Sequence, residues 1–123
     1  MKNLIIDAAD EKIFFSIISE SQSYTTSYIN NRENFDKFII LLFNFLKKNK
    51  TKFKEIKNIF VNQGPGKFSG IRNTIAIAKG LAFSNKINLY GFRSKDRERN
   101  KYEKILDLHK KGMLIKDLIK PHY

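Results

Sequence analysis

The chain has 123 residues and a formal net charge of +12, from 24 Lys and Arg against 12 Asp and Glu. This length predicts one domain with a modest core, and the absence of Cys excludes disulfides and thiolate metal sites. Asp7 follows only three apolar residues, which does not match a signal peptide, and the longest apolar run, residues 38–43, is too short to span a membrane. The charge is spread along the chain, so two interpretations stay open: affinity for polyanions, or a lysine-rich solvated surface.

Three short runs of apolar or β-branched residues near the N-terminus predict strands, at residues 3–6, 13–18 and 24–29. The polar segments between them are typical of hairpin turns. We therefore expect the fold to open with three antiparallel strands.

The apolar period changes after Asn34, where an i, i+3, i+4 spacing predicts one long helix over residues 34–48 with Asn34 as N-cap. Ile40, Leu41 and Phe43 lie outside the main apolar stripe, so packing one face on a sheet would leave them in water. A protein interface explains this surplus, and so does burial by other parts of the domain. The lysine-rich segment 47–57 is interpreted as a solvated loop or helix end, or as a phosphate contact.

A glycine-rich loop at residues 63–72 separates a predicted strand at 58–62 from a predicted helix at 69–83. Ser69 is a candidate N-cap, and Arg72 requires a nearby anion or carboxylate because the start of a helix is electropositive. The spacing matches neither a P-loop nor a dinucleotide fingerprint, so the loop is an amide-lined anion site or a tight strand-to-helix turn. The candidate residues of this loop are Gly64, Pro65, Gly66, Ser69, Gly70 and Arg72.

A last predicted strand at residues 87–92 makes a strand-helix-strand unit, which implies a parallel pair, a right-handed crossover and a mixed five-stranded sheet. Residues 93–104 are predicted to be a charged linker or an exposed helix, and a weak helical pattern interrupted at Gly112 follows. We expect residues 1–92 to form the main lobe. Residues 93–123 are expected to form a charged linker and a partly helical tail that docks only as an appendage.

Few side chains are candidates for catalysis. The histidines, His109 and His122, lie in the tail, where surface positions are the rule. Asp7 and Asp10 flank the turn after the first strand and could reach a hydrated metal ion, or could only hydrogen-bond their own backbone. Because no catalytic set can be assembled from these residues, we expect no catalytic residue, no resident metal and no cofactor.

Residues 4–9, 63–72 and 76–82, in this order, resemble the TsaB family, the accessory subunit of bacterial tRNA threonylcarbamoyladenosine synthesis. The resemblance covers residues 1–92 and implies an α/β lobe of the actin-like ATPase, or ribonuclease H-like, fold. It implies a non-catalytic cytoplasmic protein that pairs with the catalytic TsaD subunit and recruits the ATPase TsaE, with no membrane contact. Most of the family's second lobe is expected to be missing after residue 92.

By the same resemblance, the predicted helices at 34–48 and 69–83 form the layer that faces TsaD, or a second copy of this chain. Asp7 stands where actin-like ATPases keep a magnesium-associated aspartate, so it is a candidate vestigial metal or nucleotide residue. Two other functions stay open: a nucleotide-binding remnant of the actin-like fold, and a basic RNA-binding module with indirect or weak tRNA contact. The expected interface residues are Phe38, Leu41, Leu42, Phe45, Ile71, Thr74, Ile75 and Ala78.

Overall fold

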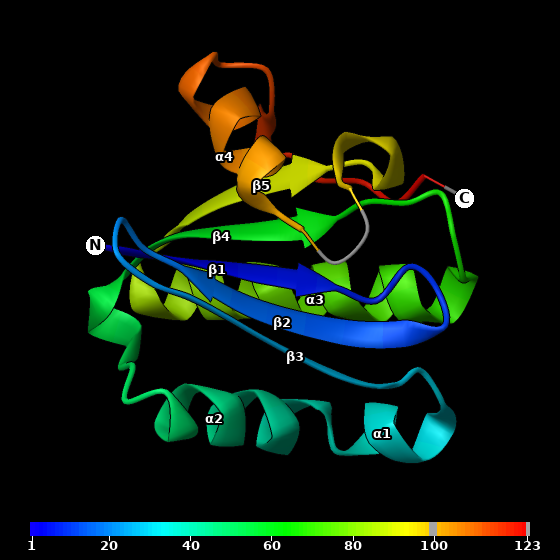
Figure 1. Ribbon diagram of the computed structural model, residues 1–123. Coiled ribbons are helices and arrows are strands. Elements are labelled where there is room, and N and C mark those ends of the chain that lie inside the picture. Colours follow the sequence, from blue (N-terminus) through cyan, green and yellow to red (C-terminus); the bar gives the residue numbers. More distant parts are fainter. Residues whose placement is uncertain (99–100, 123) are drawn as a thin grey trace.

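A mixed six-stranded sheet forms the centre of the computed structural model, which describes residues 1–98 and 101–122 (Figure 1). The strand order is β3-β2-β1-β4-β5-β6, with β1 antiparallel to β2, β2 antiparallel to β3, and β4 parallel to both β1 and β5. The predicted antiparallel opening and the predicted parallel crossover are therefore confirmed. The strands are β1 (Lys2–Asp7), β2 (Lys12–Ile18), β3 (Ser23–Ile29), β4 (Ile56–Asn62), β5 (Asn88–Phe92) and β6 (Ile115–Lys116).

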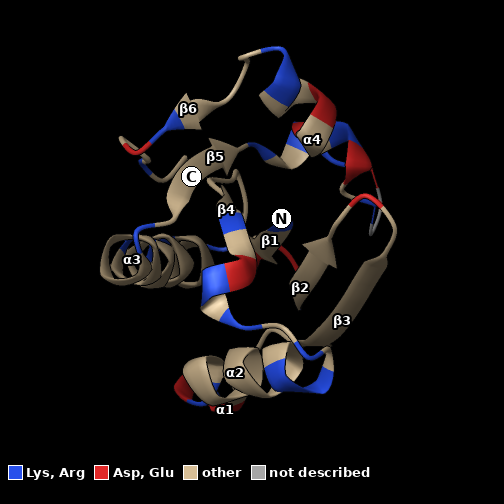
Figure 2. Ribbon diagram, turned by 90° about the vertical axis from the view of Figure 1, so that its left-hand side faces the viewer, with Lys and Arg blue, Asp and Glu red and all other residues tan. Residues whose placement is uncertain are grey.

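The helices cover both faces of the sheet. α1, α2 and α3 lie on one face, and α4 lies on the other (Figure 2). Within the described residues, no helix is both long enough and apolar enough to cross a bilayer. The helices are α1 (Arg32–Asp36), α2 (Phe38–Lys48), α3 (Phe68–Asn85) and α4 (Glu103–Lys110), with short 3-10 helices η1 (Phe53–Glu55) and η2 (Ser94–Asp96).

Two apolar clusters hold the layers together, one on each face of the sheet. Side chains alternate along a strand, so Leu4 and Ile6 of β1 join the cluster under α2 and α3, while Ile5 joins the cluster on the opposite face. All three are fully buried. A strand covered on both faces needs a continuous apolar run, which β1 has.

The tail supplies the cover for the second face. Tyr102 and Ile105 are buried in the cluster of that face, and Ile119 returns to the cluster under α3. β6 pairs antiparallel with β5 and adds a sixth strand to the five that were predicted. The expectation of a mere appendage was therefore wrong, because a sheet with apolar side chains on both faces requires a second covering layer. Residues 99, 100 and 123 of the tail lie outside the described residues, and the division at residue 92 stays a prediction.

The predicted helix over 34–48 is two helices that meet at Lys37. Asn31 is the N-cap of α1, since its side-chain oxygen accepts from the backbone N–H of Asn34 at 2.9 Å. The side chain of Asn34 donates instead to the carbonyl of Ile29 at 2.7 Å. Asn34 therefore fastens the helix to the end of β3, and the prediction that it caps the helix was wrong.

The start of α3 also differs from the prediction. Lys67 occupies the N-cap position without a side-chain capping bond, and its carbonyl accepts from the N–H of Ile71 at 3.0 Å. Ser69 lies exposed in the first turn. The helix begins two residues earlier than a Ser69 cap would allow, because the backbone of Lys67 is already held by the β1–β2 turn, where its N–H donates to the carbonyl of Ala9 at 2.6 Å.

The residues expected at the partner interface mostly face the sheet. Only Leu41 is partly exposed, and it packs against the first core cluster. The expected interface was wrong for the other seven, because the helical stripe with i, i+4, i+7 spacing is the one that this chain uses for its own core. These buried residues are Phe38, Leu42, Phe45, Ile71, Thr74, Ile75 and Ala78.

The surplus apolar surface predicted on the other side of this helix is present at Ile40 and Phe43 but not at Leu41, which packs against the first core cluster, and Ile39 adds to it. On α2, Ile39 is 39% exposed, Ile40 61% and Phe43 45%. These three side chains point away from the sheet-facing stripe, and nothing in the described ranges buries them.

Candidate functional site

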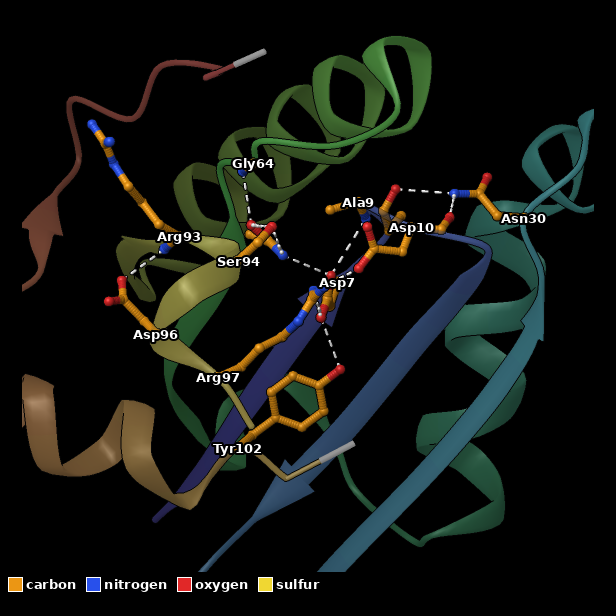
Figure 3. Close-up of polar contacts among 12 residues, drawn as sticks. Asp7, Ala9, Asp10, Asn30, Gly64, Arg93, Ser94, Asp96, Arg97 and Tyr102 are labelled. Carbon is orange, nitrogen blue, oxygen red and sulfur yellow. Dashed lines mark hydrogen bonds and ion pairs between the residues drawn. The ribbon is translucent and has the colours of Figure 1, made fainter. Parts of the chain in front are cut away.

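A buried carboxylate at the end of β1 is the centre of a polar network that joins this strand to β4 and to the tail (Figure 3). Asp7 is 1% exposed. Its Oδ1 accepts from Asn62 Nδ2 at 2.9 Å, and its Oδ2 accepts from the hydroxyl of Tyr102 at 2.9 Å and from Arg97 Nη1. Asp7 and Asn62 meet because they end neighbouring parallel strands, β1 and β4.

Arg97 bridges the two carboxylates of the β1–β2 turn. Its Nη1 pairs with Asp7 and its Nη2 with Asp10, which uses the forked geometry of the guanidinium group. Burial lowers the pKa of Arg97, but the charges of Asp7 and Asp10 outweigh it and hold that pKa above its usual value. Burial, with the adjacent Asp7 charge, also raises the pKa of Tyr102, so its phenol stays protonated and donates.

The glycine-rich loop packs on the same turn. Asn62 Oδ1 accepts from the N–H of Gly64 at 2.7 Å, which links the loop to the Asp7 network. Gly66 and Gly70 lie against the carbonyl oxygens of Ala9 and Ala8, so closely that a Cβ at either position would collide with backbone. These contacts support the tight strand-to-helix turn over an open anion site.

The 3-10 helix η2 closes this network from the tail side. Ser94 Oγ donates to the carbonyl of Pro65 at 2.8 Å and lies 3.2 Å from Asn62 Nδ2, and Ser94 N donates to the carbonyl of Gly64 at 2.9 Å. Arg97 follows directly after η2. The first residues of the tail are thus fixed to the loop and, through Arg97, to Asp7.

The chemistry available at Asp7 is set by these partners. A carboxylate that binds a hydrated metal must offer free oxygen lone pairs, whereas here the cation beside Asp7 is the guanidinium of Arg97. In residues 1–98 and 101–122, no three His, Asp or Glu side chains gather to hold a metal ion. A metal or nucleotide role for Asp7 would require Arg97 and Tyr102 to move away first.

Within residues 1–98 and 101–122, no ion pair joins Arg72 to the acidic partner that its position in the first turn of α3 led us to expect. Its guanidinium carbon lies 5.9 Å from the ring centroid of Phe68, a cation–π arrangement on the exposed side of the helix. The nearby ion pair belongs to Lys67, whose Nζ lies 3.2 Å from Glu11 Oε2. Among the described residues, the group that faces Arg72 is therefore the ring of Phe68.

Sequence reasoning missed four residues of the network: Asn62, Ser94, Arg97 and Tyr102. A signal existed for Asn62, because polar residues that end neighbouring parallel strands meet at one sheet edge. Arg97 and Tyr102 gave none. They stand 90 and 95 residues from Asp7 in a charged segment without apolar periodicity.

Comparisons with known sequences agree with the resemblance. The family model of TsaD, tRNA N6-adenosine threonylcarbamoyltransferase, matches residues 28–96. The chain is 30% identical over 88 residues to the tRNA threonylcarbamoyladenosine biosynthesis protein TsaB of Buchnera aphidicola subsp. Schizaphis graminum, a match that covers 72% of this chain and 42% of that protein. The chain therefore spans less than half the length of this relative.

Solved structures with the same fold include YeaZ from Pseudomonas aeruginosa, with a TM-score of 0.69 and 20% identity. Another, described as an uncharacterised protein with similarity to the peptidase YeaZ from Pseudomonas aeruginosa, has a TM-score of 0.70 and 20% identity. Each match covers 75% of this chain and 43% of the solved chain. The fold is thus the expected actin-like, ribonuclease H-like α/β lobe. Together with the matches of its sequence, this fold shows that the chain belongs to the TsaB (YeaZ) family, as a member that the TsaD family model also recognises.

Proposed function

We propose that this chain acts in the biosynthesis of tRNA threonylcarbamoyladenosine as a non-catalytic subunit that binds and activates a TsaD-type catalytic subunit. The observation that carries the proposal is the apolar outer side of α2, where Ile39, Ile40 and Phe43 are exposed although the sheet-facing stripe of the helix is complete. The match to a TsaB protein and to the TsaD family model supports the choice of partner.

Energetics favour a partner at this surface. Full burial of one Ile or Phe side chain is worth about 1.5–3 kcal/mol. Because 39–61% of each of these three residues is still exposed, burying the remainder is worth about half of that for each, which is enough for a small hot spot. α3 lies on the same face of the sheet (Figure 2) and adds Phe68, which is 53% exposed, and Phe83, which is 88% exposed. Gly80 on α3 has no atom within 4 Å of an added Cβ, so a partner helix could approach the backbone there.

The geometry around Asp7 supports a non-catalytic role. Its carboxylate is engaged by Arg97, Asn62 and Tyr102, so the groups that would do chemistry in an actin-like ATPase are used here to fix the tail. Calorimetry with ATP and magnesium tests the competing function as a nucleotide-binding remnant. Heat of binding that disappears in Asp7→Asn would favour that function over ours.

Co-purification with the cognate TsaD tests the proposal directly. Ile40→Asp and Phe43→Asp place a charge in the exposed apolar surface, and each is expected to weaken the complex at least tenfold, which is about 1.4 kcal/mol. Asn44→Asp is the matched control, because it puts the same charge on an exposed polar position of the same helix. Absence of a complex at micromolar concentrations, or equal binding by all three variants, would refute the proposal.

Further parts of the proposal follow the family resemblance. The complex with TsaD recruits a TsaE-type ATPase in the cytoplasm, and the chain pairs with a second copy when TsaD is absent. Residues 1–92 are proposed to carry the contact with TsaD, and the net charge of +12 is proposed to add only a weak or indirect contact with tRNA. The mass of the protein in solution, alone and mixed with TsaD, separates the homodimer from the heterodimer.

A further inference from the structure

A pocket of about 480 Å³ lies where α2 ends and the chain turns toward η1. The rings of Phe43 and Phe53 meet edge to face in it, with centroids 5.6 Å apart, and Leu46 is buried beside them. This pocket is remote in the fold from Asp7, which lies at the opposite end of β1. Its lining residues are Phe43, Leu46, Lys47, Lys50, Thr51, Lys52 and Phe53.

The rim of the pocket is strongly positive. Lys47, Lys50 and Lys52 are exposed, and none of them forms an ion pair within the part of the chain that the structure describes. Residues 47–57 contain six lysines and one acid, Glu55. Glu55 is already engaged, since its carboxylate lies 3.4 Å from the ammonium of Lys2 and accepts from the backbone N–H of Lys52 at 3.0 Å.

The C-terminal end of a helix normally repels anions because its last backbone carbonyls lack hydrogen-bond donors, but at the end of α2 these carbonyls accept hydrogen bonds. Asn49 Nδ2 donates to the carbonyl of Phe45 at 2.8 Å, and Thr51 N donates to that of Leu46 at 2.9 Å. Lys50 N donates to the carbonyl of Lys47 at 3.0 Å. Backbone and amide groups thus cap the helix, so the lysine ammonium groups of the rim are not needed for that purpose.

The inside of the pocket offers little hydrogen bonding from side chains. Thr51 carries its single hydroxyl, and this group donates to the carbonyl of Asn49 at 3.1 Å and lies 3.0 Å from Lys2 Nζ. A nucleobase would leave the polar groups on its edge unpaired among Phe43, Leu46 and Phe53, whereas an aliphatic or phenyl side chain would not. The apolar interior therefore favours a ligand with an apolar side chain, and the cationic rim favours negative charge on the same ligand.

We propose that this pocket binds an acidic segment of a partner protein that carries one bulky apolar side chain. The apolar side chain packs in the pocket against the Phe43–Phe53 ring pair and Leu46, and flanking carboxylates pair with the lysines of the rim. The inference goes beyond the proposed function, because it states the chemistry of a bound segment whichever protein supplies it. It can be tested without TsaD.

The test is a fluorescence-anisotropy titration with a short labelled peptide of Asp and Glu around a central Phe. Lys50→Glu/Lys52→Glu is expected to weaken binding by about tenfold or more at low salt, since it reverses two charges at the rim. Lys79→Glu/Lys110→Glu is the control, because it changes net charge equally at exposed positions on α3 and α4. It is expected to weaken binding by no more than about threefold. A peptide with Ser in place of Phe is expected to bind at least several-fold more weakly.

Each other outcome overturns the inference. An equal loss of peptide affinity in both double variants would mean that the net charge of the whole protein, and not the rim of the pocket, attracts the peptide. Equal affinity for the peptide with Ser in place of Phe would mean that the apolar interior is not used. A single-stranded RNA of equal charge that binds more tightly, and loses affinity in Lys50→Glu/Lys52→Glu, would assign the pocket to nucleic acid. A TsaD complex that forms normally with this variant, together with no peptide binding, would refute the pocket while leaving the proposed function intact.

Discussion

Replacing Arg97 tests whether the tail is clamped to the lobe through Asp7. Arg97→Met keeps most of the aliphatic stem but removes the cation. The carboxylate of Asp7, which is only 1% exposed, then has no positive charge paired with it. Removing one partner of a buried pair costs about 3–5 kcal/mol. Asn62 and Tyr102 still donate to Asp7, so we expect the lower end, about 3 kcal/mol. With a urea m-value of about 1–3 kcal/mol/M, the unfolding midpoint should fall by about 1–3 M.

A double-mutant cycle with Asp7→Asn isolates the pair. In Asp7→Asn, Arg97 would still face Asp10. The loss of unfolding free energy in the double variant should therefore be about 2 kcal/mol smaller than the sum of the losses in the two single variants. Urea unfolding followed by far-UV circular dichroism measures all four proteins. Arg93→Met is the control, because Arg93 is exposed, its guanidinium bonds to the ring of His122, and its backbone bonds with Asp96 are kept in the variant, so its effect should stay within about 0.5 kcal/mol. A loss below about 1 kcal/mol in Arg97→Met, or additive losses, would show that the clamp is not formed in solution.

Four further substitutions have clear expected outcomes in the same unfolding assay. Gly66→Ala should cost about 2–3 kcal/mol because its Cβ meets the backbone of Ala9, whereas Gly80→Ala, with open space around it in α3, should stabilise by about 0.5–1 kcal/mol. Asn31→Ala should cost about 1 kcal/mol by removing the cap of α1. Burial, with the charge of Lys57, lowers the pKa of His109 below its usual 6.5, so the unfolded chain binds the proton more readily. The free energy of unfolding should therefore fall as the pH drops through and below 6.5, and His109→Leu should flatten this dependence.

The N-terminal strands could be predicted well because the spacing of their apolar residues is unambiguous. The runs at β1, β2 and β4 alternate between two apolar clusters, and each was correctly placed as a strand, although the parallel pairing of β1 with β4 was not predicted. Prediction failed where two asparagines near the start of a helix compete for one role. Asn31 and Asn34 are both good caps, and only the contact of Asn34 with the carbonyl of Ile29 decides between them.

The choice of interface residues failed for a related reason. A helix with apolar residues on several sides does not say which stripe faces its own sheet, and the regular stripe through Phe38, Leu42 and Phe45 was assigned to a partner although it is the core stripe. The tail posed a harder problem. Tyr102 and Ile105 cover a sheet face formed by residues far away in sequence, so local periodicity could not reveal their burial.

The position of the tail bears on the meaning of the exposed side of α2. A small lobe with apolar side chains on both faces of its sheet needs two covers, and α4 with its flanking residues provides the second on the face opposite α2 (Figure 2). The ion pair of Arg97 with Asp7 and the burial of Ile105 hold the tail there. A tail held on that face does not shield Ile40 or Phe43, which remain 61% and 45% exposed. The described tail therefore leaves the apolar surface of α2 open to solvent, which supports our proposal that a partner covers this surface.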